Sequence, residues 1–435
     1  MGQILSTPNV TREQSSDQDE KLYYGLSCMQ GWRVSMEDAH TTILDLWKQE
    51  KNKKLGKSDY AALFGIYDGH GGDEVAKYLG AKFDDIVTGA YDDNQEKGYE
   101  SWLTSAFLQA DRQMLSDPQA QYFTSGSTAT VVVIENDTLV CANAGDSRSI
   151  LSANGAVKAL SFDHKPSNEG EKARIVAAGG FVDVGRVNGN LALSRAIGDF
   201  EFKRANDLPA HDQAVTALPD IIEHKITPQD EFIVLACDGI WDSLTSQQVV
   251  DIVRYYVKEG KPLDVIGSEI VDICLAPDSA GSGIGCDNMS ICIVALLQGR
   301  TIEEWYEYMK EKIPDNLINP GELHLDLYAS TLADKKIWIE DLGGYSNNSD
   351  DKSSHISDDN ETTGDTKDEN EHVRDLIDEL LNDESVRGDN GHIYLDKVNP
   401  GLLARLLRRP SPSDERTAEG TSVLKEEDTD EDESK

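Results

Sequence analysis

The fold is expected to be organised around one short stretch, Leu63-Phe64-Gly65-Ile66-Tyr67-Asp68-Gly69-His70-Gly71-Gly72. Apolar residues from Tyr60 to Tyr67 predict a buried strand, and the glycines that follow end it. Asp68 therefore stands where a strand meets a loop. This position suits a metal ligand, because the strand fixes the carboxylate and the glycines allow a close approach.

Two further junctions between an apolar run and a loop carry an acid. Residues 232–239 read Phe-Ile-Val-Leu-Ala-Cys-Asp-Gly and end at Asp238, whereas Asp287 comes just before the apolar run 289–297. Acids at three strand ends are what a metal site built on a sheet would require. The strands show hairpin-like spacing and stand before and after helical segments, which predicts an α+β fold with antiparallel sheets.

Composition limits the kinds of partner. The formal net charge is -39, with 80 acids against 41 bases, so a nucleic-acid backbone or an anionic membrane surface would be repelled. The six cysteines form no CxxC pair and predict reduced core thiols, which favours the cytoplasm and nucleus. No apolar run reaches the roughly 18 residues that span a bilayer, so we expect no stable membrane insertion.

The candidate metal ligands are all oxygen donors, which favours Mg²⁺ or Mn²⁺ over zinc. Several carboxylates in one pocket cannot all ionise without cations, and two cations could hold a bridging water and lower its pKa. Taken singly, Asp146 is better interpreted as a turn residue, and the Glu37-Asp38 pair as a surface ion pair with Arg33. The acids in question are Glu37, Asp38, Asp68, Asp238 and Asp287, with Asp146 and Asp242 as additions.

Two further side chains would serve phosphoryl chemistry. Arg33 has the fork geometry that binds phosphate oxygens, and His70 could protonate a leaving alkoxide. A histidine after Asp-Gly is also a common loop hydrogen-bonding group, so the joint occurrence of these residues carries the functional interpretation.

The same residues lie in ten motifs that resemble the type 2C, metal-dependent protein serine/threonine phosphatases (the PPM family). The resemblance runs from about Leu22 to Leu297, and the amino terminus and acidic tail are similar to those of fungal members that oppose stress MAP kinases and checkpoint kinases. The motifs are Met29–Arg33, Met36–His40, Tyr67–Gly72, Ser125–Ala129, Gly145–Arg148, Asp163–Pro166, Arg186–Gly189, Leu193–Asp199, Cys237–Asp242 and Asp287–Ser290.

The resemblance implies a central antiparallel β-sandwich flanked by α-helices, with two metal ions in a cleft at one end. Asp68 would bridge both ions, and the carbonyl of Gly69 would reach one of them. Arg33 would bind the phosphate and His70 would be the acid, while Arg186 would lie in a substrate-facing flap that runs from Asp163 to Asp220. Asp238 and Asp287 would bind one ion, and Glu37 and Asp38 would bind that ion directly or orient its water ligands. A weaker third ion would be bound by Asp146, Asp238 and Asp242.

The resemblance also implies a division of the chain. We expect residues 22–299 to form the catalytic domain and 300–340 a partly helical extension. Residues 1–21 are predicted to be flexible, with a pattern for myristoylation at Gly2. Residues 341–435 are acidic and predicted to be largely disordered. Thr429 and Ser411 stand near acids there, so we expect their phosphorylation and docking of phospho-reading domains.

The predicted function is hydrolysis of phosphoserine and phosphothreonine in proteins, with kinases among the substrates, by a monomer. The alternative is an inactive scaffold of the same fold that acts through its acidic tail, but no metal acid or arginine is missing. A thiol phosphatase is excluded because Cys28 and Arg33 lack the spacing of that class and no histidine precedes the cysteine. The negative charge argues against a nuclease.

Overall fold

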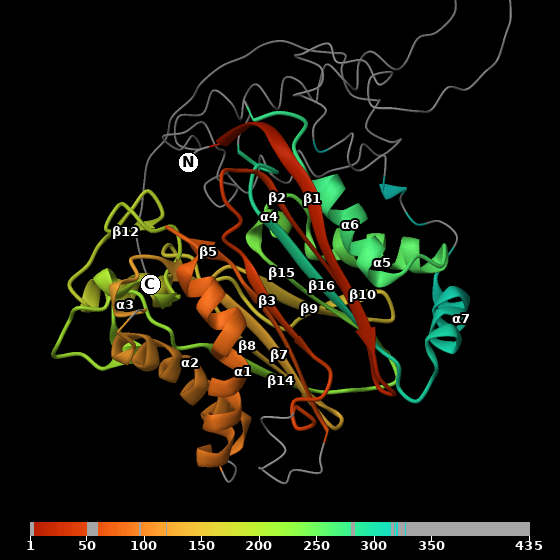
Figure 1. Ribbon diagram of the computed structural model, residues 1–435, viewed down its shortest axis with the longest axis horizontal. Coiled ribbons are helices and arrows are strands. Elements are labelled where there is room, and N and C mark those ends of the chain that lie inside the picture. Colours follow the sequence, from red (N-terminus) through yellow and green to blue (C-terminus); the bar gives the residue numbers. More distant parts are fainter. Residues whose placement is uncertain are drawn as a thin grey trace, which may run out of the picture. The chain divides into compact units, whose positions relative to one another are not determined.

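Two antiparallel sheets form the centre of the fold in this computed structural model (Figure 1). The structure describes residues 4–49, 60–94, 97–118, 120–279 and 283–314, with 317, 319, 320 and 327. One sheet has the order β1 (Ile4–Gln18), β2 (Leu22–Arg33), β16 (Met289–Leu296), β15 (Asp230–Ala236), β9 (Arg148–Ala153), β10 (Ala156–Ala159). The other has the order β14 (Asp220–Lys225), β8 (Thr138–Ala144), β7 (Ala129–Glu135), β4 (Ala61–Tyr67), β3 (Ala39–Ile43).

Helices cover the outer face of each sheet (Figure 1). The helices α1 (Glu74–Asn94) and α2 (Gly98–Ser116) share a buried cluster with β4, β7 and β8. On the other side, α5 (Ser246–Lys258) and α6 (Leu263–Cys274) pack on β15 and β16, and α7 (Ile302–Lys312) packs against α5. The predicted β-sandwich flanked by helices is confirmed.

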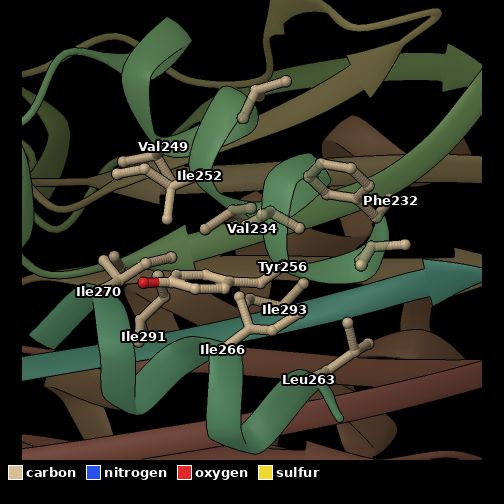
Figure 2. Packing of buried hydrophobic residues seen from close by; sticks show 14 of the residues in the cluster. Phe232, Val234, Val249, Ile252, Tyr256, Leu263, Ile266, Ile270, Ile291 and Ile293 are labelled. Carbon is tan, nitrogen blue, oxygen red and sulfur yellow. The ribbon is translucent and has the colours of Figure 1, made fainter. Parts of the chain in front are cut away.

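Strand β15 shows why the sequence contains continuous apolar runs. Phe232 and Val234 point toward α5 and α6, as Figure 2 shows, while Ile233 and Leu235 face the cluster between the two sheets. Alternate side chains of a strand point to opposite faces. Because both faces of this sheet are covered, every residue in the strand is buried, so its pattern reads as a run and not as an alternation.

The amino-terminal segment corrects one prediction. We predict residues 1–21 to be flexible from their polar composition, but Ile4–Gln18 forms β1 and pairs antiparallel with β2. Arg12 makes an ion pair with Asp272, and Ile4 packs against a cluster that contains Trp32. An edge strand that is mostly exposed needs backbone pairing and no apolar pattern, so its composition resembles that of a loop.

Beyond β16 the chain forms α7, the helix predicted in the 300–340 extension. It begins with a capping box in which Thr301 and Glu304 bond each other's backbone N–H groups, and it buries Trp305 and Met309 against the helix layer. Gly2 and the tail with Ser411 and Thr429 lie outside the described residues. All six cysteines are buried and none is in a disulfide, as predicted. Among the described helices, none has the length and apolarity to cross a bilayer.

Candidate metal centre and active site

The three acid-bearing junctions meet in one cleft of about 420 Å³. Asp68 follows β4, Asp238 opens the short helix α4 (Asp238–Trp241) after β15, and Asp287 precedes β16. Asp146, in the turn between β8 and β9, lines the same cleft. The sheet order places β4 in one sheet and β15 and β16 in the other. The site therefore lies where the ends of both sheets meet.

Of the other predicted residues, some line the cleft and others lie beside it. Arg33, Gly69, His70 and Arg186 line it. Asp38 is buried and lies against Asp68, with carboxylate oxygens within 4.8 Å of each other. The remaining two predicted ligands, Glu37 and Asp242, are partly buried and exposed, respectively, and are outside the lining.

The cleft acids repel one another. Burial and the neighbouring carboxylates, Asp238 foremost, raise the pKa of Asp68 well above its usual range. The pKa of Asp238 is raised in the same way by burial and by Asp146, Asp287 and Asp242. Burial and the charge of Asp287 also raise the pKa of Asp38, to about 6, although the hydrogen bond from Ser290 acts to lower it. A cation bound among these groups would relieve the repulsion.

The donor set fits a hard divalent cation. Ser290 donates its hydroxyl to Asp38 Oδ2 at 2.6 Å, while Asp38 Oδ1 is buried with no hydrogen-bond partner within the described residues. Cys237 lies within the same 4.8 Å group, but burial and the nearby acids raise its pKa well above the usual thiol range. A neutral thiol is a poor ligand, which leaves carboxylate oxygens as the available donors.

Arg33 is held at the cleft by Asp287. Its Nη2 lies 2.6 Å from Asp287 Oδ2, and the two side chains are 35% and 32% exposed. The neighbouring Asn288 joins the loop before β16 to the loop after β2. Its Nδ2 donates to the Ser35 carbonyl and its Oδ1 accepts a hydrogen bond from the Glu37 N–H, each at 2.9 Å. The guanidinium is therefore positioned from β2 and from the loop before β16 together.

His70 is paired with an acid that the sequence reasoning did not single out. In β5 (Gly69–His70), its Nε2 lies 2.6 Å from Asp199 Oδ2. Burial lowers the pKa of His70, but the charge and hydrogen bond of Asp199 outweigh this and raise it. A Cβ at Gly126, in the adjoining strand β6 (Gly126–Ser127), would collide with both side chains. Glycine is therefore required behind this pair.

Asp146 is also paired with a side chain that was missed. Lys165 Nζ lies 2.5 Å from Asp146 Oδ2, and Asp146 is buried. An additional cation at Asp146 and Asp242 would have to compete with this ammonium group. Lys165 and Asp199 both stand in the quoted motifs, but 129 residues separate His70 from Asp199. Their pairing has no local signal in the sequence.

The predicted flap is a small structured unit at the end of the sandwich away from α7 (Figure 1). It contains α3 (Glu169–Ala177) and a hairpin of β11 (Val182–Asp183) and β12 (Arg186–Val187). Glu171 accepts hydrogen bonds from Ser194 and Arg195 at 2.6 and 2.7 Å, and Arg195 also bonds Asp220 of β14 at 2.8 Å. Although burial opposes it, this pairing lowers the pKa of Glu171 to about 2. The flap is thus tied to the sheet.

Comparison with known proteins yields one consistent family. Residues 22–283 match the family model described as protein phosphatase 2C. The chain is 51% identical over 316 residues to protein phosphatase 2C homolog 3 of Schizosaccharomyces pombe, covering 73% of this chain and 74% of that protein. It is 50% identical over 320 residues to protein phosphatase 2C homolog 2 of Saccharomyces cerevisiae, covering 72% of this chain and 67% of that protein.

A similar fold occurs among solved structures. A crystal structure of a phosphatase from Toxoplasma gondii aligns with a TM-score of 0.55 and 23% identity, covering 66% of this chain and 96% of that one. A second T. gondii structure, described as a serine-threonine phosphatase 2C, aligns with a TM-score of 0.54 and 21% identity, covering 66% of this chain and 99% of that one. At this identity the likeness concerns the fold alone.

Proposed function

The chain belongs to the protein phosphatase 2C family of metal-dependent protein serine/threonine phosphatases, and on this premise we propose that it dephosphorylates proteins with a water activated between two metal ions. One observation carries the proposal. Asp68, Asp238 and Asp287, which are far apart in the sequence, line one cleft together with Arg33. Carboxylates that raise one another's pKa beside a guanidinium form a site for cations and a phosphoryl group.

Mg²⁺ or Mn²⁺ is the proposed cofactor, with two ions and a weaker third. Asp68 and the Gly69 carbonyl would hold them together with Asp238 and Asp287, and the additional ion would be held by residues that include Asp146 and Asp242. Glu37 and Asp38 would bind directly or orient bound water. When bound, such ions neutralise the carboxylates and lower the pKa of a water molecule.

The chain's own residues would orient the substrate and move a proton. Arg33 keeps one guanidinium nitrogen on Asp287, so its other donors are proposed to bind phosphoryl oxygens. His70 is bonded to Asp199 through Nε2, which leaves Nδ1 to release a proton to the departing serine or threonine oxygen. Arg186, on the flap side, is proposed to contact the substrate.

The test uses the full chain with a phosphothreonine peptide and p-nitrophenyl phosphate. We expect hydrolysis that depends on Mn²⁺ or Mg²⁺ and that is abolished by Asp238→Ala in a folded protein. A folded wild-type chain that binds manganese but turns over neither substrate would favour the alternative, an inactive scaffold that acts through its tail.

Kinases of stress and checkpoint signalling are the proposed substrates, in the cytoplasm and nucleus, on the basis of the resemblance to fungal members. An Asp238→Ala variant used as a substrate trap should retain phosphorylated kinases from stressed cells. Myristoylation at Gly2 is proposed from its sequence pattern, and intact-mass measurement of the protein from a eukaryotic host would detect the acyl chain.

A further inference from the structure

One side of the catalytic cleft is apolar. Leu191, Ala192, Leu193 and Phe202 from the flap line the same cavity as the metal-site acids. Leu193 is buried, Leu191 and Phe202 are partly buried, and Ala192 is exposed. The hydrolysis of a phosphate group uses none of these side chains. A ligand that fills the cleft therefore meets charge on one side and hydrocarbon on the other.

The hairpin beside this wall exposes further apolar side chains. At its tip, Val184 and Gly185 have φ angles of 46° and 71°, the positive values that a tight two-residue hairpin turn requires. A β-branched residue in this region of backbone conformation is rare and strained. Val184 is nevertheless 77% exposed, and Phe181, just before β11, is 54% exposed. Asparagine would form the same turn with less strain.

The hairpin and the apolar wall are one connected unit. Arg186 lines the cleft and donates through Nη1 to the Asn190 carbonyl at 2.7 Å, and Val187 pairs with Leu191. Val187 is fully buried in the small core of the flap. Arg186, Leu191 and the tip are therefore displayed by the same supported loop.

We propose that this flap wall, defined as Leu191, Ala192, Phe202 and the tip residue Val184, binds an apolar side chain of the substrate close to the phosphorylated serine or threonine. The inference rests on the proposed function, because the phosphate must be held at Arg33 for the neighbouring residue to reach the wall. Leu191, Ala192 and Phe202 line the cleft that the phosphoprotein enters, and Val184 is at the tip of the hairpin whose Arg186 lines the same cleft, which identifies the occupant. An apolar substrate side chain would bind more tightly because its surface is removed from water there, whereas a polar side chain would lose its hydrogen bonds to water.

The test compares phosphothreonine peptides that differ only by leucine or asparagine at one position, taken in turn on each side of the phosphothreonine. With the full chain and Mn²⁺, we expect one position where kcat/KM favours leucine by about tenfold, the value of one partly buried aliphatic side chain. Ala192→Asp and Val184→Asn should each reduce that preference to less than about twofold.

The variants are chosen so that misfolding does not explain the result. Ala192 is exposed and asparagine accepts the positive φ of Val184, so neither change disturbs the core, and in the presence of Mn²⁺ both variants should unfold close to the wild-type temperature. Leu115→Asn on α2, which removes an apolar side chain that is 53% exposed and outside the cleft lining, should keep the wild-type preference.

Three results would overturn the inference. The first is a wild-type protein that hydrolyses p-nitrophenyl phosphate but treats every leucine and asparagine pair alike. The second is a preference that Ala192→Asp and Val184→Asn both leave intact, which would place the recognition elsewhere. The third is a folded protein that also fails on p-nitrophenyl phosphate, which would overturn the proposed function together with the subsite.

Discussion

Replacing Asp68 by asparagine should stabilise the metal-free protein and abolish its activity. The carboxylate oxygens of Asp38 and Asp68 lie within 4.8 Å of each other, a separation at which two charges repel by about 3 kcal/mol at an effective dielectric constant of about 20. Burial, together with the charges of Asp238 and Asp38, raises the pKa of Asp68 well above its usual range, so an ionised Asp68 reduces the stability of the metal-free protein at neutral pH. Asparagine keeps the shape of the side chain and removes its charge.

The gain in stability of the metal-free Asp68→Asn protein should depend on pH. A carboxyl group whose pKa is higher in the folded state costs no stability below its unfolded pKa and reduces stability as pH rises through the folded pKa. Asp68 and Asp38 both have raised pKa values. The difference between variant and wild type should therefore be small near pH 4 and grow as pH rises from about 4 toward neutral.

Calorimetric unfolding in EDTA at neutral pH measures the effect. Allowing for relaxation of the remaining acids, we expect Asp68→Asn to gain about 2 kcal/mol, or a Tm higher by about 4 °C. Glu223→Gln, at an exposed position of β14, removes one charge outside the cleft and should change Tm little. Manganese at about 100 times its Kd should stabilise the wild type by about 2.7 kcal/mol and the variant by less.

The opposite sign would refute the reasoning. If Asp68→Asn unfolds at a lower temperature than wild type in EDTA, the cleft acids do not repel one another in the folded protein. Equal stabilisation of both proteins by manganese would show that Asp68 does not bind it.

Three other predictions concern separate parts of the protein. His70→Gln should lower kcat on a phosphothreonine peptide by about 10²-fold or more, but affect p-nitrophenyl phosphate far less because nitrophenolate leaves without a proton; equal losses would argue against an acid role. Glu171→Gln should lower the free energy of unfolding by about 3 kcal/mol at pH 7, measured by denaturant titration. This difference from wild type should disappear as pH falls from about 4.5 to 2, because the folded pKa of Glu171 is about 2; a difference that does not depend on pH would contradict the prediction. Deleting residues 1–18 should lower Tm by about 5 °C because the edge of β2 loses its partner; an unchanged Tm would mean that β1 adds no stability.

The sequence was most informative where burial controls the residue pattern. Asp68, Asp238 and Asp287 could be found because each lies just beyond the end of a strand that is buried on both faces. A charged residue next to such an apolar run is conspicuous in the sequence. That they share one cleft follows from how β4, β15 and β16 are ordered in two sheets; their positions at strand ends suggested a common metal site, and the motif resemblance placed that site in a cleft.

Two features could not be predicted because they depend on long-range pairing. β1 is held by backbone hydrogen bonds to β2 and by a few side-chain contacts, which a polar composition neither reveals nor excludes. Asp199 reaches His70, and Lys165 reaches Asp146, only when the flap is folded. The sequence marks these residues as members of motifs but does not indicate which side chain each one neutralises.

The register of β1 restricts what can be attached to the amino end. Ile4 pairs with Arg33, the proposed phosphate-binding residue, so the first described residue of β1 lies at the end of β2 that reaches the cleft. A bulky recombinant tag attached ahead of β1 would be added on this side and would crowd incoming phosphoproteins. Protein immobilised for capture experiments should therefore keep its amino end free.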